Sequence, residues 1–212
     1  MFRTLTISLV FVLVTGTGRI EGKANQVKEE FQQQLHVRIY GYAQVSPGIL
    51  AEAKRVAGSI FRKIGVEILW LDHSFDGNSG EGIFNRESTY PQLQLRILNQ
   101  QMAERLPVNK TMTGLAFQGT GGQLGRVANV FYHRVEELAK SNTCSKGEIL
   151  GHAAAHELGH LLLGNLDHSS TGLMQAKLGH KELQSAARGD LVFTEPQARL
   201  IRKALTQPLS QP

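Results

Sequence analysis

The sequence predicts an α/β (α+β) fold, and three observations support this class. The chain opens with a strand, a helix and a second strand over residues 35–71. Further short apolar segments follow between residues 93 and 133, and a long apolar helix that carries several histidines comes after them. Strand and helix segments in this order, with helices long enough to cover a sheet, are typical of the class.

The opening unit has a local signal for each element. Residues 35–40 alternate apolar and polar side chains, which is the period of a half-buried strand. Ser46 followed by Pro47 predicts an N-cap and the first position of a helix. Apolar residues at helical spacing continue this helix until Gly65 ends it, and residues 66–71 form the second predicted strand.

Three more strands are predicted before the histidine-bearing helix. Residues 93–98 form a third strand, residues 114–117 an edge strand and residues 126–133 a further strand. The glycine-rich segment 76–82 is expected to be a loop, because glycine and turn residues interrupt regular structure. After the histidines, a C-terminal helix is expected over residues 194–205, capped by its first residue, a threonine.

The histidine-bearing helix is expected to begin near Ser145 and to end at Gly164. Glu148 suits a first turn, where the helix dipole favours negative charge. Gly164 suits the position after the last turn, where a positive φ is common. Gly151 and Gly159 inside the helix cost about 1 kcal/mol each relative to alanine, which suggests close packing against a neighbouring element.

Two histidines in this helix have the spacing of a metal site. His156 and His160 are four residues apart and therefore project from one helix face, close enough to bind one tetrahedral Zn²⁺. Glu157 lies beside the first histidine, where it can act as general base on a metal-bound water. A catalytic zinc site needs a third protein ligand and an open position, and His168 is the candidate.

Three other side chains compete for the role of third ligand. Asp167 has an acceptable ligand atom, or it could orient a ligand histidine without touching the metal. Glu182 would be the ligand in an arrangement where a short following helix supplies a glutamate, and His180 is the remaining option. His152 lies one turn before His156, too far along the axis to reach the same metal. We expect it to be a buried histidine bonded to a carbonyl or carboxylate.

This motif resembles that of the metzincin-type zinc metallopeptidases of the zincin clan. The matching residues are His156, Glu157, His160, Gly164, His168 and Met174. In the clan's usual pattern the glycine follows the second histidine by three residues and the third ligand follows it by six. Here the intervals are four and eight. This longer spacing also resembles poorly characterised exported bacterial proteins predicted to be metzincin-like.

The resemblance implies both a fold and an activity. It implies a twisted mixed sheet whose antiparallel edge strand borders the cleft, a loop at 119–125 beside that strand, and Met174 in a tight turn beneath the metal. The implied activity is that of a zinc-dependent endopeptidase, in which Glu157 is the general base and the peptide lies extended along the edge strand. No tyrosine follows His168, so the tyrosine near the metal in some metzincin families has no counterpart there.

A second interpretation is a non-catalytic zinc-binding exported protein that retains the metallopeptidase fold. Glu157 argues against it, since a structural metal site has no need of that carboxylate. A third interpretation is an ordinary helix with fortuitous histidines, which does not explain His168 and Met174 together.

The N-terminal segment predicts export. Residues 1–24 have the pattern of a signal peptide, with an early Arg3, a mostly apolar stretch over 5–14 and then small residues, too short for a membrane span. Residues 25–212 would then form one metallopeptidase-like catalytic domain. Cys144 is the only cysteine, so no internal disulfide is possible.

The formal net charge of +5 comes from basic residues scattered along the chain. No basic run is interleaved with aromatic residues, so nucleic acid is not an expected partner. No later segment is long and apolar enough to predict a transmembrane helix. We expect a monomer that acts on a peptide or protein substrate.

Overall fold

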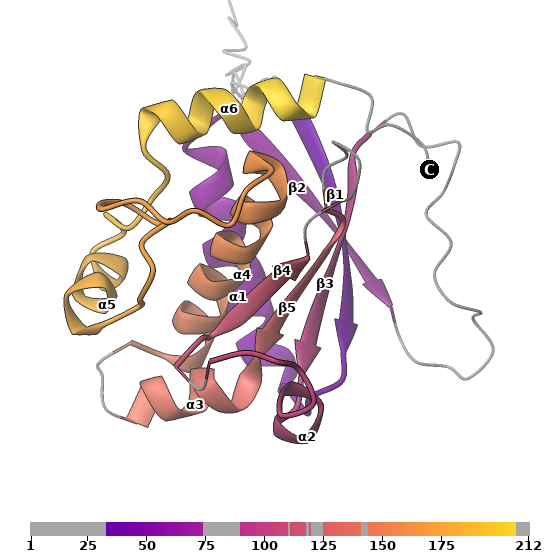
Figure 1. The fold of residues 1–212 in the computed structure, drawn as a ribbon, viewed down its shortest axis with the longest axis vertical. Coiled ribbons are helices and arrows are strands. Elements are labelled where there is room, and N and C mark those ends of the chain that lie inside the picture. Colours follow the sequence, from indigo (N-terminus) through magenta and orange to yellow (C-terminus); the bar gives the residue numbers. More distant parts are fainter. Residues whose placement is uncertain are drawn as a thin grey trace, which may run out of the picture. The chain divides into compact units, whose positions relative to one another are not determined.

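The computed structural model describes residues 33–73, 90–109, 111–117, 119, 125–140 and 144–206, which belong to one compact unit (Figure 1). The strands are β1 Gln33–Gly41, β2 Val66–His73, β3 Gln92–Leu98, β4 Gly114–Phe117 and β5 Val127–Phe131. The helices are α1 Pro47–Arg62, α2 Gln100–Ala103, α3 Tyr132–Lys140, α4 Lys146–Leu163, α5 His180–Ala187 and α6 Glu195–Thr206. The predicted signal peptide 1–24, the predicted loop 76–82 and most of the segment 119–125 lie outside the described residues.

The five strands form one mixed sheet in the order β2-β1-β3-β5-β4. The β1–β2, β1–β3 and β3–β5 pairs are parallel, with Val37 between Trp70 and Leu93, whereas β4 runs antiparallel to β5 at the sheet edge. The parallel β1–β2 pair needs a crossover, and α1 supplies it. The predicted α/β class, with 114–117 as an antiparallel edge strand in a mixed sheet, is confirmed.

Helices α1 and α4 lie against the same face of the sheet (Figure 1). Alternate residues of β1, namely Leu35, Val37 and Ile39, are buried in the core between this helix layer and the sheet. Helix α4 is buried along most of its circumference, because it packs on α1, β4, β5 and α6. This central position holds the histidine-bearing helix rigidly against the antiparallel edge of the sheet.

The signals at both ends of α1 act as predicted. Ser46 is the N-cap, its side chain accepts a hydrogen bond from the Ile49 backbone, and Pro47 is the first helical residue. Gly65 follows the helix with a φ of 74°, in the region that favours glycine. These local features account for the turn from α1 into β2.

One predicted strand was too long. The segment 126–133 forms β5 only as far as Phe131, and Tyr132 begins α3. The physical reason is a change of period, because Tyr132 and Val135 are buried at a spacing of three residues whereas Glu137 and Lys140 are exposed. An Arg134–Glu137 ion pair at 2.6 Å, three residues apart, also suits a helix. Neither α3 nor α2 was expected from the sequence.

In the described part of the chain, no helix combines the length and the apolar character needed to cross a membrane.

Candidate metal centre

The helix that carries the histidines begins with a complete capping box. The Ser145 side chain accepts a hydrogen bond from the Glu148 backbone at 3.0 Å, and the Glu148 carboxylate accepts one from the Ser145 backbone at 2.8 Å. At the other end Gly164 has a φ of 70°, and its N–H donates to the His160 carbonyl at 3.1 Å. Both ends of α4 therefore lie where the sequence predicted them.

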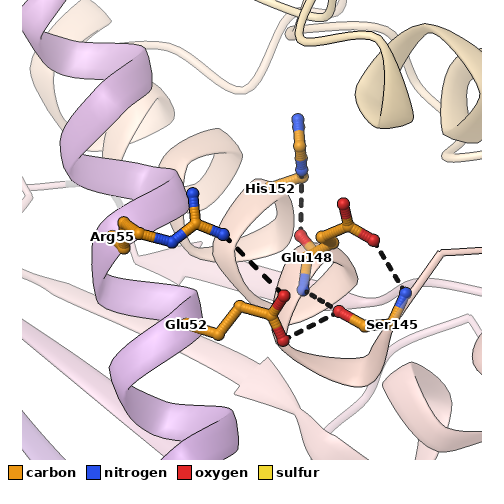
Figure 2. Close-up of polar contacts among 5 residues, drawn as sticks. All are labelled: Glu52, Arg55, Ser145, Glu148 and His152. Atoms are coloured by element: carbon orange, nitrogen blue, oxygen red, sulfur yellow. Dashed lines mark hydrogen bonds and ion pairs between the residues drawn. The ribbon is translucent and has the colours of Figure 1, made fainter.

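The start of α4 is also attached to α1, as Figure 2 shows. The Ser145 hydroxyl donates to the Glu52 carboxylate at 2.8 Å, and Arg55 lies 3.8 Å from the same carboxylate. Gly147 lies so close that a Cβ there would be 2.7 Å from the Glu52 Cβ. These contacts set the position of α4 against the helix beside it.

Three histidines converge at the other half of α4. His156 and His160 come from the helix, and His168 comes from the segment that follows Gly164. One ring nitrogen from each lies within 4.8 Å of the corresponding nitrogens of the other two. The ring centroids are 4.6 to 5.4 Å apart. In the part of the chain that the structure describes, these three form the group of His, Cys, Asp or Glu side chains suited to hold a metal.

Backbone carbonyls fix the orientation of the two helical histidines. His156 Nδ1 lies 2.8 Å from the Leu173 carbonyl oxygen, and His160 Nδ1 lies 3.0 Å from that of Asn165. A carbonyl oxygen only accepts, so each Nδ1 carries the hydrogen and each Nε2 is left with a lone pair. Such carbonyl partners commonly orient metal-binding imidazoles.

The two Nε2 atoms lie 3.0 Å apart. Two lone pairs facing each other at this distance repel, and a cation between them removes the repulsion. A tetrahedral zinc with Zn–N bonds of about 2.0–2.1 Å would separate its nitrogens by roughly 3.3 Å. Burial lowers the pKa of His156 to about 4 and also lowers the pKa of His160, so both rings are neutral at pH 7, as metal ligands must be. The donor set therefore fits Zn²⁺.

The turn that ends at Met174 supports this face of the helix. Gly172 adopts a φ of 74°, and the turn brings the Leu173 carbonyl to His156. Met174 is fully buried, and a Cβ at Gly159 would lie 2.7 Å from the Met174 Sδ and from the Phe193 ring. The expected close packing at Gly159 is confirmed, and it holds this turn against α4.

Glu157 lies on α4 beside the edge strand. Glu157 is 5% exposed, and a Cβ at Gly114 in β4 would lie 2.6 Å from the Glu157 Oε1. Burial raises the pKa of Glu157 to about 8, and a hydrogen bond from the Ala116 backbone opposes this shift. A bound cation nearby would also lower the pKa, because opposite charge favours the carboxylate.

A cavity of about 260 Å³ opens beside these groups. Its walls come from the segment before β4, from α4, from the turn that ends at Met174 and from the start of α5. The histidines and carboxylates that line it are His152, His156, Glu157, His168 and Glu182. The cavity therefore connects the three-histidine cluster and the buried carboxylate with a space for a ligand group.

The other sequence candidates have different positions. Glu182 caps α5, where its carboxylate accepts from the Gly179 backbone at 3.0 Å, and His180 contacts Gln184 at 3.0 Å. Asp167 is exposed and lies outside the three-histidine group.

His152 is buried and donates from Nδ1 to the Glu148 carbonyl at 2.9 Å, as expected for a buried histidine bonded to a carbonyl. The carbonyls of Leu173 and Asn165 were missed, and no side-chain pattern could have revealed backbone partners.

Comparisons with known proteins add the following. No family model matches the chain, and no curated protein matches it in sequence. Among solved structures, the chain is similar to archaemetzincin from Methanopyrus kandleri, with 15% identity, coverage of 85% of this chain and 99% of that chain, and a TM-score of 0.47. It is also similar to a zinc-dependent peptidase from Methanocorpusculum labreanum, with 15% identity, coverage of 79% and 99%, and a TM-score of 0.46.

Proposed function

We propose that this chain is a zinc-dependent endopeptidase of metzincin type. In this proposal His156, His160 and His168 are the metal ligands and Glu157 is the general base. The observation that carries it is the convergence of three imidazole nitrogens within 4.8 Å, beside a buried carboxylate in a cavity. Three neutral imidazoles that leave a position open for water or substrate are typical of a catalytic zinc site.

In the proposed reaction, the metal and the residues around it have separate roles. When bound, Zn²⁺ would supply Lewis acidity, which makes water more acidic and polarises a carbonyl group. Glu157 would accept the proton of the attacking water and deliver it to the leaving amine, and a pKa near the working pH suits a group that does both. The Leu173 and Asn165 carbonyls would keep the ligand rings in orientation.

The edge strand is where we propose that the peptide binds. In the described sheet β4 pairs with β5 alone, and an extended substrate would pair along its other side, next to the Ala116 N–H that Glu157 binds. Glu157 touches this strand at Gly114 and accepts from Ala116. A substrate added to β4 would therefore pass close to the carboxylate and the three histidines.

The decisive experiment compares the wild type with Glu157→Gln on a broad library of unstructured peptides. The variant keeps the shape of the side chain but cannot accept a proton, so zinc should stay bound while hydrolysis falls by roughly 10²–10⁴-fold. A chelator control excludes contaminating serine peptidases. Equal hydrolysis by both proteins would remove Glu157 from the mechanism. Zinc binding without zinc-dependent cleavage by either protein would favour the non-catalytic zinc-binding exported protein.

We also propose that the protein is exported through its N-terminal segment. The charge and apolar pattern of residues 1–24 support this. N-terminal sequencing of the mature protein from a fractionated culture would test it, since an intact Met1 in the cytoplasmic fraction alone would contradict export.

A further inference from the structure

One buried polar group beside the three-histidine cluster has no part in the proposed catalysis. His152 lies one turn before His156 on α4, is 4% exposed and lines the cavity. Its Nδ1 donates to the Glu148 carbonyl at 2.9 Å. Because that nitrogen carries the hydrogen, Nε2 has a lone pair and can only accept.

The ring of His152 is held in place by a chain of contacts (Figure 2). The Glu148 backbone, whose carbonyl binds His152, donates to Ser145, and Ser145 donates to Glu52 on α1. Figure 2 shows the second ring nitrogen of His152 pointing away from Glu148. The acceptor therefore has a defined direction, set by the capping box of α4 and not by the metal ligands.

The side chains that line the cavity favour a hydrogen-bond donor opposite Nε2 of His152. Glu182 is half-buried on the cavity wall and its carboxylate is also an acceptor, whereas the lining Lys177 is exposed to solvent. Burial lowers the pKa of His152, so the ring is neutral at pH 7 and does not attract an anion. An apolar group that displaces water from this nitrogen would leave it without a partner, which is unfavourable for a buried polar atom.

We propose that His152 is a specificity-determining residue, and that the cavity selects a substrate side chain that donates a hydrogen bond. This inference rests on the proposed function, because it concerns a peptide held at the same site. Four residues along a helix span about 6 Å, which matches the reach of a side chain as long as that of glutamine or lysine. Side chains without a donor, such as methionine, and those that only accept, such as glutamate, are selected against.

The test uses zinc-chelating ligands, so that it does not depend on turnover. Succinyl hydroxamates whose first side chain is that of glutamine, methionine or glutamate are titrated into the zinc-loaded full chain by calorimetry. Glutamine and methionine differ little in size, so their ratio of dissociation constants reports the hydrogen bond. We expect the glutamine ligand to bind roughly 10-fold more tightly than the methionine ligand, and the glutamate ligand to bind most weakly.

Two variants and a control assign the effect to one nitrogen. His152→Leu should bring the glutamine-to-methionine ratio to one or reverse it, with zinc content unchanged. His152→Gln, whose amide can also donate, should reduce the discrimination against glutamate. The same leucine substitution at His180, which does not line the cavity, should leave all three affinities as in the wild type.

The outcomes separate this inference from the proposed function. Equal binding of glutamine and methionine ligands to the wild type, or an unchanged ratio in both His152 variants, overturns the inference while zinc binding and peptide cleavage stand. Absence of peptide cleavage with the expected hydroxamate ratios overturns the peptidase activity and supports the role of His152. If none of the ligands binds the zinc-loaded protein while peptide cleavage persists, the inference is wrong and the proposed function stands.

Discussion

The three histidines of α4 share one ring orientation but differ in what their Nε2 atoms face. His152, His156 and His160 each donate from Nδ1 to a backbone carbonyl, so all three direct the Nε2 lone pair outward. The Nε2 atoms of His156 and His160 face each other at 3.0 Å, whereas His152 borders the cavity. The third nitrogen of the cluster comes from the exposed His168, and a ligand on an exposed segment is the one most easily tested by removal.

Replacing His168 with alanine should weaken zinc retention by roughly 10-fold or more, because two imidazoles would remain where a zinc site needs three protein ligands. The zinc content of each protein after dialysis against a weak competing chelator measures its zinc retention. His180→Ala, another exposed histidine outside the cluster, is the matched control and should retain zinc like the wild type. Full zinc occupancy in His168→Ala would transfer the ligand role to Asp167.

In the metal-free protein, Glu157→Gln should raise stability at pH 8 and leave it nearly unchanged at pH 5. The folded-state pKa of about 8 lies above the ordinary value of 4.5. The folded state therefore binds more protons between these values, and stability is lost as the pH rises through this window. Glutamine removes the buried charge. We expect the Tm of the chelated variant to exceed that of the wild type by several degrees at pH 8.

Thermal unfolding of both proteins across pH 5–8 gives the comparison. A constant difference in Tm over this range would show that burial does not raise the pKa of Glu157 in the folded protein.

Among the elements, α1 and α4 form the rigid base of the site. Their contact depends on Gly151, where a Cβ would lie 2.7 Å from the Ala53 carbonyl and from Val56. The Glu52–Ser145 hydrogen bond joins the two helices near the start of α4. Close packing of two helices thus places the face that carries the histidines at a set distance from the sheet edge.

Gly151→Ala should destabilise the protein by roughly 1–3 kcal/mol, because the backbone carbonyl of Ala53 cannot move aside easily. Helix propensity alone predicts the opposite sign, a gain of about 1 kcal/mol. Urea denaturation measures the difference. Gly58→Ala in α1 is the matched control, since a Cβ there would lie 3.9 Å from the Trp70 Nε1, and it should be neutral or stabilising. A stabilising Gly151→Ala would contradict the packing described here.

On the scale of the whole molecule, the proposed metal would join two parts of the chain. His156 and His160 belong to the central helix, and His168 belongs to the segment that leads to the turn at Met174. That turn is itself paired to the chain before α6, because the Leu173 N–H donates to the Val192 carbonyl at 2.8 Å. Binding at this point would stabilise the folded state relative to the unfolded chain.

Chelation should therefore lower the Tm of the wild type. At a free zinc concentration about 100-fold above Kd, binding contributes about 2.7 kcal/mol, which corresponds to roughly 5–10 °C for a chain of this size. Differential scanning calorimetry with and without chelator gives the shift. His168→Ala should show a much smaller one, and an equal shift in that variant would mean that the stabilising metal lies elsewhere.

The local pattern of the sequence determined most of the elements, though not α2 or α3, and half of the site. The spacing of His156 and His160 places both on one helix face in any helix, and Ser145 and Gly164 mark its ends through hydrogen bonds within a few residues. The mixed sheet with the edge strand 114–117 was also expected, although its order came from a resemblance. The strand 126–133 was wrong at its end, because a short helix after Phe131 has too few residues to show a clear period.

Tertiary structure alone decided which side chain joins the two helical histidines. Asp167, His168, His180 and Glu182 all follow α4 with suitable atoms, and their distances to the helix depend on how the loop folds back. Sequence spacing does not encode that path, since it is set by Gly172, by the Leu173–Val192 hydrogen bond and by Met174 packed on Gly159. The Leu173 carbonyl that orients His156 depends on the same long-range packing, whereas the carbonyl partners of His160 and His152 lie within five residues along the chain.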